Sequence, residues 1–296
     1  MASISTKKST NVRILSAALR VADRVAPPLA AAAVTRTWFR LPPGPWPVPL
    51  PAGGAPFEQP SQGSVVRGHT WGDGPVVYLV HGWAGRGSQL AGFVEPLVQR
   101  GHRVVLFDGL SHGDSGPGAR GSHTSNGVEL GRSLDDVATR FGPAAAVVAH
   151  SMGAVATLLA VRHGWLGTDR LALLAPLGSY DSAFTPFADH LGLSPRTREL
   201  VDKAVARRVG LPTEEFDLTF LAGEVEPVPT LVVHDRGDRQ TSYDESVRLV
   251  ECLPDARLLT THGLGHRRLL ADPAVVDAVT SFVAGAEIPA GLPATA

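Results

Sequence analysis

Short apolar segments alternate with segments of helical spacing along most of this sequence, and this alternation constrains the fold more than any other feature. Apolar runs that suit strands occupy residues 76–80, 102–108, 144–150, 170–176, 230–234 and 256–260. Helical patterns occupy 88–101, 124–142, 151–163 and 242–253, with one more within 272–285. Strands that are apolar throughout and alternate with helices form a parallel sheet covered on both faces. We therefore predict an α/β fold with a mostly parallel central sheet and helices on both faces, and ligands at the carboxyl ends of the strands.

Two segments depart from the alternation. Residues 1–63 contain an amphipathic helix followed by a stretch rich in Pro and Gly over 41–63, which predicts a wrapping segment without regular structure. Residues 177–228 carry Phe and Leu among helix formers and prolines, and we predict a small inserted helical lid there. A surface excursion without a role in substrate binding is the alternative. The rest divides into the α/β core, 64–176 and 229–286, and a flexible tail, 287–296.

The N-terminal helix is predicted from its two faces. Arginines share one face, at positions 13, 20 and 24, and Ile14, Ala18, Val21, Ala22 and Val25 share the other. We expect the apolar face to dock on the protein's own domain. Contact with a membrane surface or a partner is one alternative, and a cleaved signal peptide is another. The sequence contains no run of 18 apolar residues, so it predicts no membrane-spanning helix.

Composition excludes several classes of function. The chain has 296 residues, of which 44% are apolar and 19% charged, as in ordinary globular proteins. Its net charge of −1 offers no basic surplus, so we expect no nucleic-acid partner. Cys252 is the only cysteine, which excludes an internal disulfide and a zinc site of several cysteines. The lack of cysteine pairing and of a clear export signal favours the cytoplasm.

The stretch "AHSMG" stands where a buried strand turns into a helix of small residues. This is the context of a nucleophile elbow, G-x-S-x-G, with Ala149 in place of the first glycine. The elbow would lift Ser151 to the top of the sheet, and Gly153 would let strand and helix approach closely. The amide of Met152 would lie at the helix N-terminus and face an oxyanion. A serine that only caps the helix is the alternative.

A serine nucleophile needs a histidine base, which in turn needs a carboxylate to orient it. In chain order, the elbow serine is followed by the acid and then by the histidine. "VVHDRGDRQ" supplies Asp235 and Asp238, and "THGLGHRRLL" supplies His262 and His266. The two aspartates follow one predicted strand and the two histidines follow another, so all four belong to the same sheet edge as Ser151.

Five blocks in this order resemble the α/β-hydrolase family of serine hydrolases. They are "VYLVHGWAGRGSQL", "FDGLSHGDSG", "AHSMGA", "LVVHDRGDRQTS" and "GLGHRRLL", and the resemblance runs from about residue 64 to residue 285. It implies Ser151 as nucleophile, Asp238 as acid and His266 as base. The backbone amides of Trp83 and Met152 would form the oxyanion hole.

The resemblance also implies supporting roles for other residues in these blocks. Asp235 would order its loop, and His262 would be a residue at the end of a strand. His81, Asp108 and His112 would be structural. Ser111 occupies a position where the family usually has glycine.

The predicted reaction is two-step acyl transfer without a metal or an organic cofactor. Trp83, Phe184 and Phe187 are expected to line the substrate pocket, and the apolar lid favours an ester or thioester of a hydrophobic acid. A C–C bond hydrolase or an amidase with the same triad is an alternative. A protein that keeps the cavity and binds a ligand without turnover is another.

Overall fold

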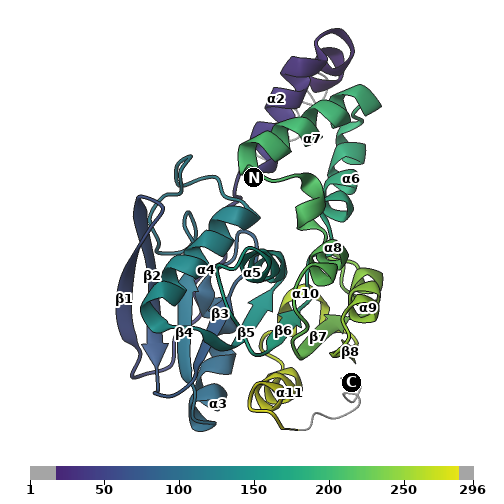
Figure 1. Ribbon diagram of the computed structural model, residues 1–296. Coiled ribbons are helices and arrows are strands. Elements are labelled where there is room, and N and C mark those ends of the chain that lie inside the picture. Colours follow the sequence, from purple (N-terminus) through teal and green to yellow (C-terminus); the bar gives the residue numbers. More distant parts are fainter. Residues whose placement is uncertain (1–17, 287–296) are drawn as a thin grey trace, which may run out of the picture. The chain divides into compact units, whose positions relative to one another are not determined.

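The computed structural model describes residues 18–286 (Figure 1). Arg13, Ile14 and the predicted tail 287–296 lie outside the described residues. The chain divides into two compact units. The helical unit comprises Met1–Arg40 and Tyr180–Thr213, and the sheet unit comprises Leu41–Ser179 and Glu214–Ala296.

The sheet unit contains an eight-stranded sheet in the order β1-β2-β4-β3-β5-β6-β7-β8. The strands are β1 (Ala55–Ser61), β2 (Ser64–Trp71), β3 (Val76–Val80), β4 (Arg103–Asp108), β5 (Ala144–His150), β6 (Leu171–Leu174), β7 (Thr230–Asp235) and β8 (Ala256–Thr261). β1 pairs with β2, and β2 with β4, in antiparallel register, whereas all the other pairs are parallel. The predicted mostly parallel sheet is confirmed.

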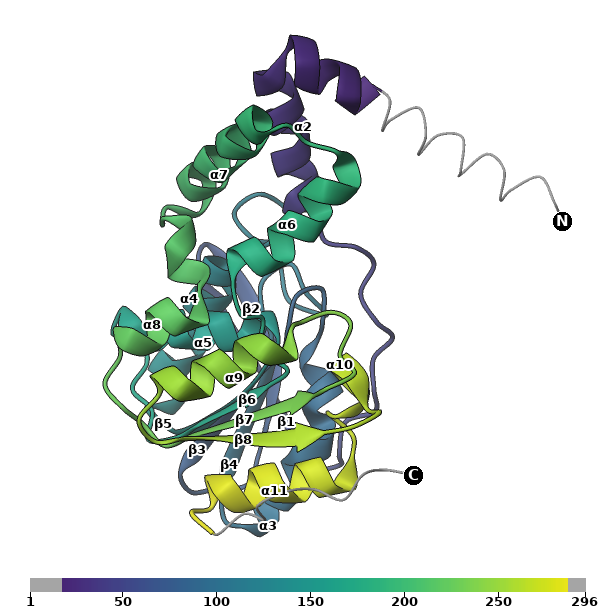
Figure 2. The same ribbon diagram turned by 90° about the vertical axis from the view of Figure 1, so that its right-hand side faces the viewer.

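Helices cover both faces of this sheet, as predicted (Figure 2). On one face lie α3 (Val94–Gln99), which continues the 3-10 helix η1 (Gly87–Phe93), and α11 (Pro273–Val283). On the other lie α4 (Gly127–Phe141), α5 (Met152–Arg162) and α9 (Tyr243–Cys252). All five residues of β3 are buried, because a central strand between two helical layers has no solvent-facing side.

The first strand corrects one prediction, because residues 55–61 were expected to lack regular structure. Pro56 and Pro60 suggested a loop, yet β1 is an edge strand, and an edge strand tolerates proline. Phe57 is buried opposite Gly68 of β2, where a Cβ on the glycine would lie 2.7 Å from the Phe57 ring. The Phe57 ring therefore packs over a residue of the paired strand that has no side chain.

The predicted lid, 177–228, has different boundaries in the structure. It contains α6 (Tyr180–Leu191), α7 (Pro195–Val209), η2 (Thr213–Phe216) and α8 (Leu218–Gly223). Of these residues, 180–213 group with the N-terminal residues up to Arg40, whereas 214–228 belong to the sheet unit.

Aromatic packing holds the helical unit together. α2 (Pro27–Trp38) begins with two prolines, which suit the first turn of a helix. Trp38 is the last residue of α2. The centroid of its ring lies 5.9 Å from that of Tyr180, 5.2 Å from that of Phe184 and 5.4 Å from that of Phe187. This cluster explains why the N-terminal segment joins the middle of the predicted lid. No helix within residues 18–286 is both long and apolar enough to cross a membrane.

Candidate active site

Ser151 occupies a sharp turn between β5 and α5. Its backbone has φ 54° and ψ −120°, a conformation that is strained for a residue with a side chain. The amide of Ser151 donates to the carbonyl of Leu174 at 3.0 Å, which ties the turn to β6. A Cβ on Gly153 would lie 2.6 Å from the carbonyl oxygen of His81 and 2.7 Å from that of Val80. Only glycine therefore allows α5 to approach the end of β3 this closely.

Asp238 and His266 lie together, as the sequence predicted. Asp238 follows β7, and His266 lies in the short helix α10 (Gly265–Arg268) after β8. Nδ1 of His266 is 2.7 Å from Oδ2 of Asp238, whose side chain is fully buried. Because a carboxylate only accepts, Nδ1 carries the proton and Nε2 of the neutral ring keeps its lone pair.

The surroundings of Asp238 favour its charged form. Burial by itself would raise the pKa of this carboxyl group. Hydrogen bonds from His234, from His266 and from the backbone amide of Gln240 outweigh burial and hold the pKa well below its usual range. The Gln240 amide donates to Oδ1 at 2.7 Å, and the Thr241 hydroxyl donates to Oδ2 at 3.0 Å. Asp238 is therefore an anion that can orient an imidazole and stabilise its cation.

His150 connects the serine turn to the His266 helix. Its Nε2 lies 2.9 Å from the carbonyl oxygen of His266, and the two rings have centroids 4.6 Å apart. Burial, followed by the neighbouring His266, lowers the pKa of His150 to about 3, so its ring is neutral and Nε2–H donates. Among residues 18–286, no hydrogen bond joins Ser151 to His266. Hydrogen bonds between catalytic groups are often long or poorly aligned without substrate and tighten only when substrate binds.

The loop after β3, which contains Trp83, passes beside the serine turn at Gly82. A Cβ on Gly82 would lie 2.8 Å from the Cβ of Ser151 and 3.1 Å from the carbonyl oxygen of His150. Met152 is the first residue of α5, where backbone amides have no acceptor within the helix. The amides of Trp83 and Met152 therefore belong to the two backbone segments that meet at Ser151.

Two neutral histidines hold this loop. His81 accepts from the amide of Gly109 at 3.0 Å and donates to the carbonyl of Gly82 at 2.8 Å. His112 accepts from the amide of Ala84 at 3.2 Å and donates to a carbonyl on its own loop. Burial lowers the pKa of His81 to about 4 and that of His112 to about 3. All these contacts are with backbone, as expected for structural residues.

The loop after β4 has the same structural character. Asp108 accepts from the amides of Gly87 at 2.7 Å and Asp114 at 2.8 Å, so it links two loops. Ser111 has φ 65°, in the left-handed region that favours glycine. This conformation explains why glycine is usual at its position in the family that the sequence resembles.

Asp235 and His262 are the alternative acid and histidine, and their surroundings differ from those of Asp238 and His266. Oδ1 of Asp235 accepts from the amide of Gly237, and Oδ2 accepts from the Thr261 hydroxyl and the Leu264 amide, all at 2.8 Å. Burial would raise its pKa, but these bonds outweigh burial and lower it. Asp235 thus orders the loops after β7 and β8, while His262 is exposed.

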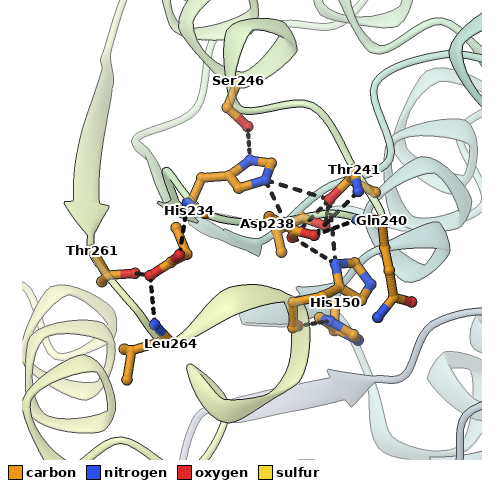
Figure 3. A network of polar contacts seen from close by, with 12 residues as sticks. His150, His234, Asp238, Gln240, Thr241, Ser246, Thr261 and Leu264 are labelled. Atoms are coloured by element: carbon orange, nitrogen blue, oxygen red, sulfur yellow. Dashed lines mark hydrogen bonds and ion pairs between the residues drawn. The ribbon is translucent and has the colours of Figure 1, made fainter.

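His234 is a site residue that the sequence analysis missed. It is fully buried at the end of β7, and its Nε2 lies 3.4 Å from Oδ2 of Asp238 and 3.3 Å from the Thr241 hydroxyl (Figure 3). Its Nδ1 lies 2.6 Å from the hydroxyl of Ser246 in α9. Since Asp238 accepts, Nε2–H of His234 donates to it and Nδ1 accepts from Ser246. The only sequence signal was a histidine four residues before Asp238, inside an apolar strand.

The three aromatic residues expected in a pocket lie in different places. Phe184 and Phe187 belong to α6 of the helical unit and pack on Trp38. Trp83 is partly buried in the sheet unit, with its ring centroid 6.2 Å from that of His112. Their contact with substrate stays a prediction.

Two family models match the chain. One, described as serine aminopeptidase S33, matches residues 74–209, and the other, described as TAP-like protein, matches residues 203–294. A search of curated proteins found no match to the sequence.

Several solved structures share the fold at low sequence identity. A putative lipase from Acinetobacter baumannii AYE has a TM-score of 0.63 at 17% identity, covering 78% of this chain and 91% of its own. A membrane phospholipase A, described as a bacterial virulence factor, has a TM-score of 0.62 at 17% identity, covering 95% of this chain and 98% of its own. A meta-cleavage product hydrolase from Pseudomonas fluorescens IP01 has a TM-score of 0.56 at 16% identity, covering 77% and 96%.

Sheet order, helical layers and the strained serine turn together define the α/β-hydrolase fold. The two family models extend over this same part of the sequence. The chain belongs to the α/β-hydrolase family of serine hydrolases, and it is an enzyme of that class.

Proposed function

We propose that this protein cleaves a carboxylic ester or thioester with a hydrophobic acyl group, using Ser151, Asp238 and His266 as its catalytic triad. The observation that carries the proposal is the pairing of His266 with a fully buried, charged Asp238 at 2.7 Å. A histidine held in this tautomer has its Nε2 free to accept a proton. The strained turn at Ser151 supplies the matching nucleophile position.

The reaction would proceed through an acyl-enzyme. The Ser151 hydroxyl attacks the carbonyl carbon while its proton passes to Nε2 of His266, and the negative charge on Asp238 stabilises the resulting imidazolium. The amides of Trp83 and Met152 would donate to the oxyanion. Collapse of the tetrahedral intermediate expels the alcohol or thiol, which takes the proton from His266. Water activated by His266 then releases the acid, and Ser151 recovers its proton.

An ester is preferred over other bonds for two reasons. Two structural neighbours are described as a putative lipase and a membrane phospholipase A, and both names denote ester hydrolases. The predicted lid is rich in apolar side chains, which suits an acyl chain better than a charged peptide. A C–C bond hydrolase is the second candidate, because a meta-cleavage product hydrolase shares the fold.

The test combines a covalent probe with a series of substrates. A fluorophosphonate should label the wild-type protein and leave Ser151→Ala unlabelled, while Ser242→Ala, an exposed serine, serves as the matched control. p-Nitrophenyl esters of increasing chain length then measure the acyl preference. Labelling without hydrolysis of any ester or thioester would redirect the search to C–C bond substrates. No labelling of the folded wild type would favour a protein that binds its ligand without turnover.

A further inference from the structure

Charge is divided unequally between the two units of this protein. Residues 1–40 and 180–213 of the helical unit hold 12 of the 27 Lys and Arg residues but only 5 of the 28 Asp and Glu residues. The helical unit therefore carries a formal charge of +7, and the remainder of the chain carries −8. The overall charge of −1 conceals this separation.

The N-terminal helix of this basic unit is the purple segment before α2 in Figure 2. It exposes apolar side chains. Residues 18–25 are helical, with Val21 60% exposed and Val25 77% exposed. Leu29, in the first turn of α2, is 70% exposed. Arg20 and Arg24 are also exposed and form the neighbouring row of the helix surface, since each precedes one of the valines by one residue.

The opposite side of this helix makes the contact with the rest of the helical unit. Asp23 is buried, and its Oδ1 accepts from the amide of Ser194 at 3.1 Å and from the Ser194 hydroxyl at 2.9 Å. The apolar face was expected to dock on the protein itself. Instead, the helix docks through Asp23, and this anchor points the two valines to solvent.

We propose that the surface formed by Arg20, Val21, Arg24, Val25 and Leu29 binds an anionic lipid membrane. A helix with exposed apolar side chains beside arginines lies in the membrane interface, with its apolar side in the acyl boundary and its cations near phosphates. Lys7, Lys8 and Arg13 precede it in the sequence and add to the positive charge. Isologous pairing of two copies through this surface would bring two units of charge +7 together, which disfavours a second copy as the occupant.

The proposal can be tested by vesicle co-sedimentation of the full chain, independently of which bond the enzyme cleaves. Vesicles of phosphatidylcholine with about one-third phosphatidylglycerol should bind the protein, pure phosphatidylcholine vesicles should bind it more weakly, and added salt should reduce binding. The double variant Arg20→Gln/Arg24→Gln should bind about 30-fold more weakly, because each basic residue near an anionic surface contributes about a fivefold factor. Arg248→Gln/Arg257→Gln, which removes two exposed charges from the sheet unit, should bind as the wild type does.

The apolar contribution has its own variant and control. Val21→Gln/Val25→Gln should lower binding at least tenfold, because it removes the apolar area that would enter the membrane. Trp46→Gln, which removes a 92% exposed side chain of the sheet unit, should leave binding unchanged. All these positions are exposed, so thermal melting should match the wild type.

Three results would overturn the proposal. The first is no binding of the wild type to anionic vesicles. The second is an equal loss of binding in the surface variants and their controls. The third is a dimer in solution that Val21→Gln/Val25→Gln dissociates, since a second copy would then cover this surface.

Discussion

Gly153→Ala tests whether the close approach of α5 to β3 creates the geometry at Ser151. In most helices this change is stabilising by up to about 1 kcal/mol, because alanine has the higher helix propensity. Here the new Cβ would lie 2.6 Å and 2.7 Å from two backbone carbonyl oxygens of His81 and Val80. α5 would have to retreat by roughly 0.8–0.9 Å to bring the shorter of these contacts to an ordinary van der Waals distance of about 3.5 Å. Overpacking of this kind costs about 1–3 kcal/mol of stability.

The same movement should reduce activity, because α5 carries Met152 at its start and adjoins Ser151. A displacement of this size at a reacting group lowers the rate by about 10- to 100-fold. Thermal melting and kcat/KM for a p-nitrophenyl ester measure the two effects. Gly223→Ala is the matched control, since it lies in α8 with no atom within 4 Å of the new Cβ. A Gly153→Ala variant with the Tm and kcat/KM of the wild type would refute the reasoning.

Three other predictions follow from the polar contacts. Asp238→Asn should lower kcat by about 10⁴-fold with the fold retained, because an amide cannot hold His266 in the same tautomer. Circular dichroism measures the fold and steady-state kinetics measure kcat. A kcat close to that of the wild type would contradict the prediction. His234→Phe should lower kcat/KM by about 10- to 100-fold, since a hydrogen bond to a charged group contributes about 1.5–3 kcal/mol. Ser246→Ala should have a smaller effect. Equal kcat/KM values for the wild type and both variants would show that His234 has no role in the reaction. Acid should destabilise the protein, because its buried neutral histidines, His81, His112 and His150, gain protons on unfolding. Their folded pKa values of about 3 to 4 lie below the unfolded value of about 6.5, so their stabilisation is complete above pH 6.5 and is lost as the pH falls. Urea unfolding at pH 7 and pH 5 should differ by up to about 6 kcal/mol, and identical free energies would refute the assignment.

The parallel part of the sheet could be predicted because its signal is local. A strand buried on both faces must be apolar at every position, and the intervening helices repeat their own period. The serine turn was likewise readable, because a strand, a serine between small residues and a helix occur in one continuous stretch. The antiparallel strand β1 was missed because its prolines and its pairing with β2 depend on the sheet edge rather than on local preference.

The residues alone left both Asp235 and Asp238 open as the acid, the family resemblance favoured Asp238, and the structure shows that Asp238 pairs with His266. Asp235 and Asp238 stand three residues apart, yet one accepts from loop amides and the other from His266 and His234. The position of His234 in an apolar strand gave no hint that α9 would supply its Ser246 partner. Such contacts join residues that are distant in sequence, and therefore no pattern along the chain encodes them directly.

The sequence by itself thus determined the parallel part of the sheet, its helical layers and the strand-to-helix turn at Ser151, because these depend on periodicity and on one short turn. The tertiary structure shows the contact between Asp238 and His266 and adds His234, which donates to Asp238 from the end of β7. It also decided which side of the N-terminal helix faces solvent. A helical wheel separates polar from apolar sides, but burial of Asp23 against Ser194 sets the orientation, and that contact spans 171 positions of the chain.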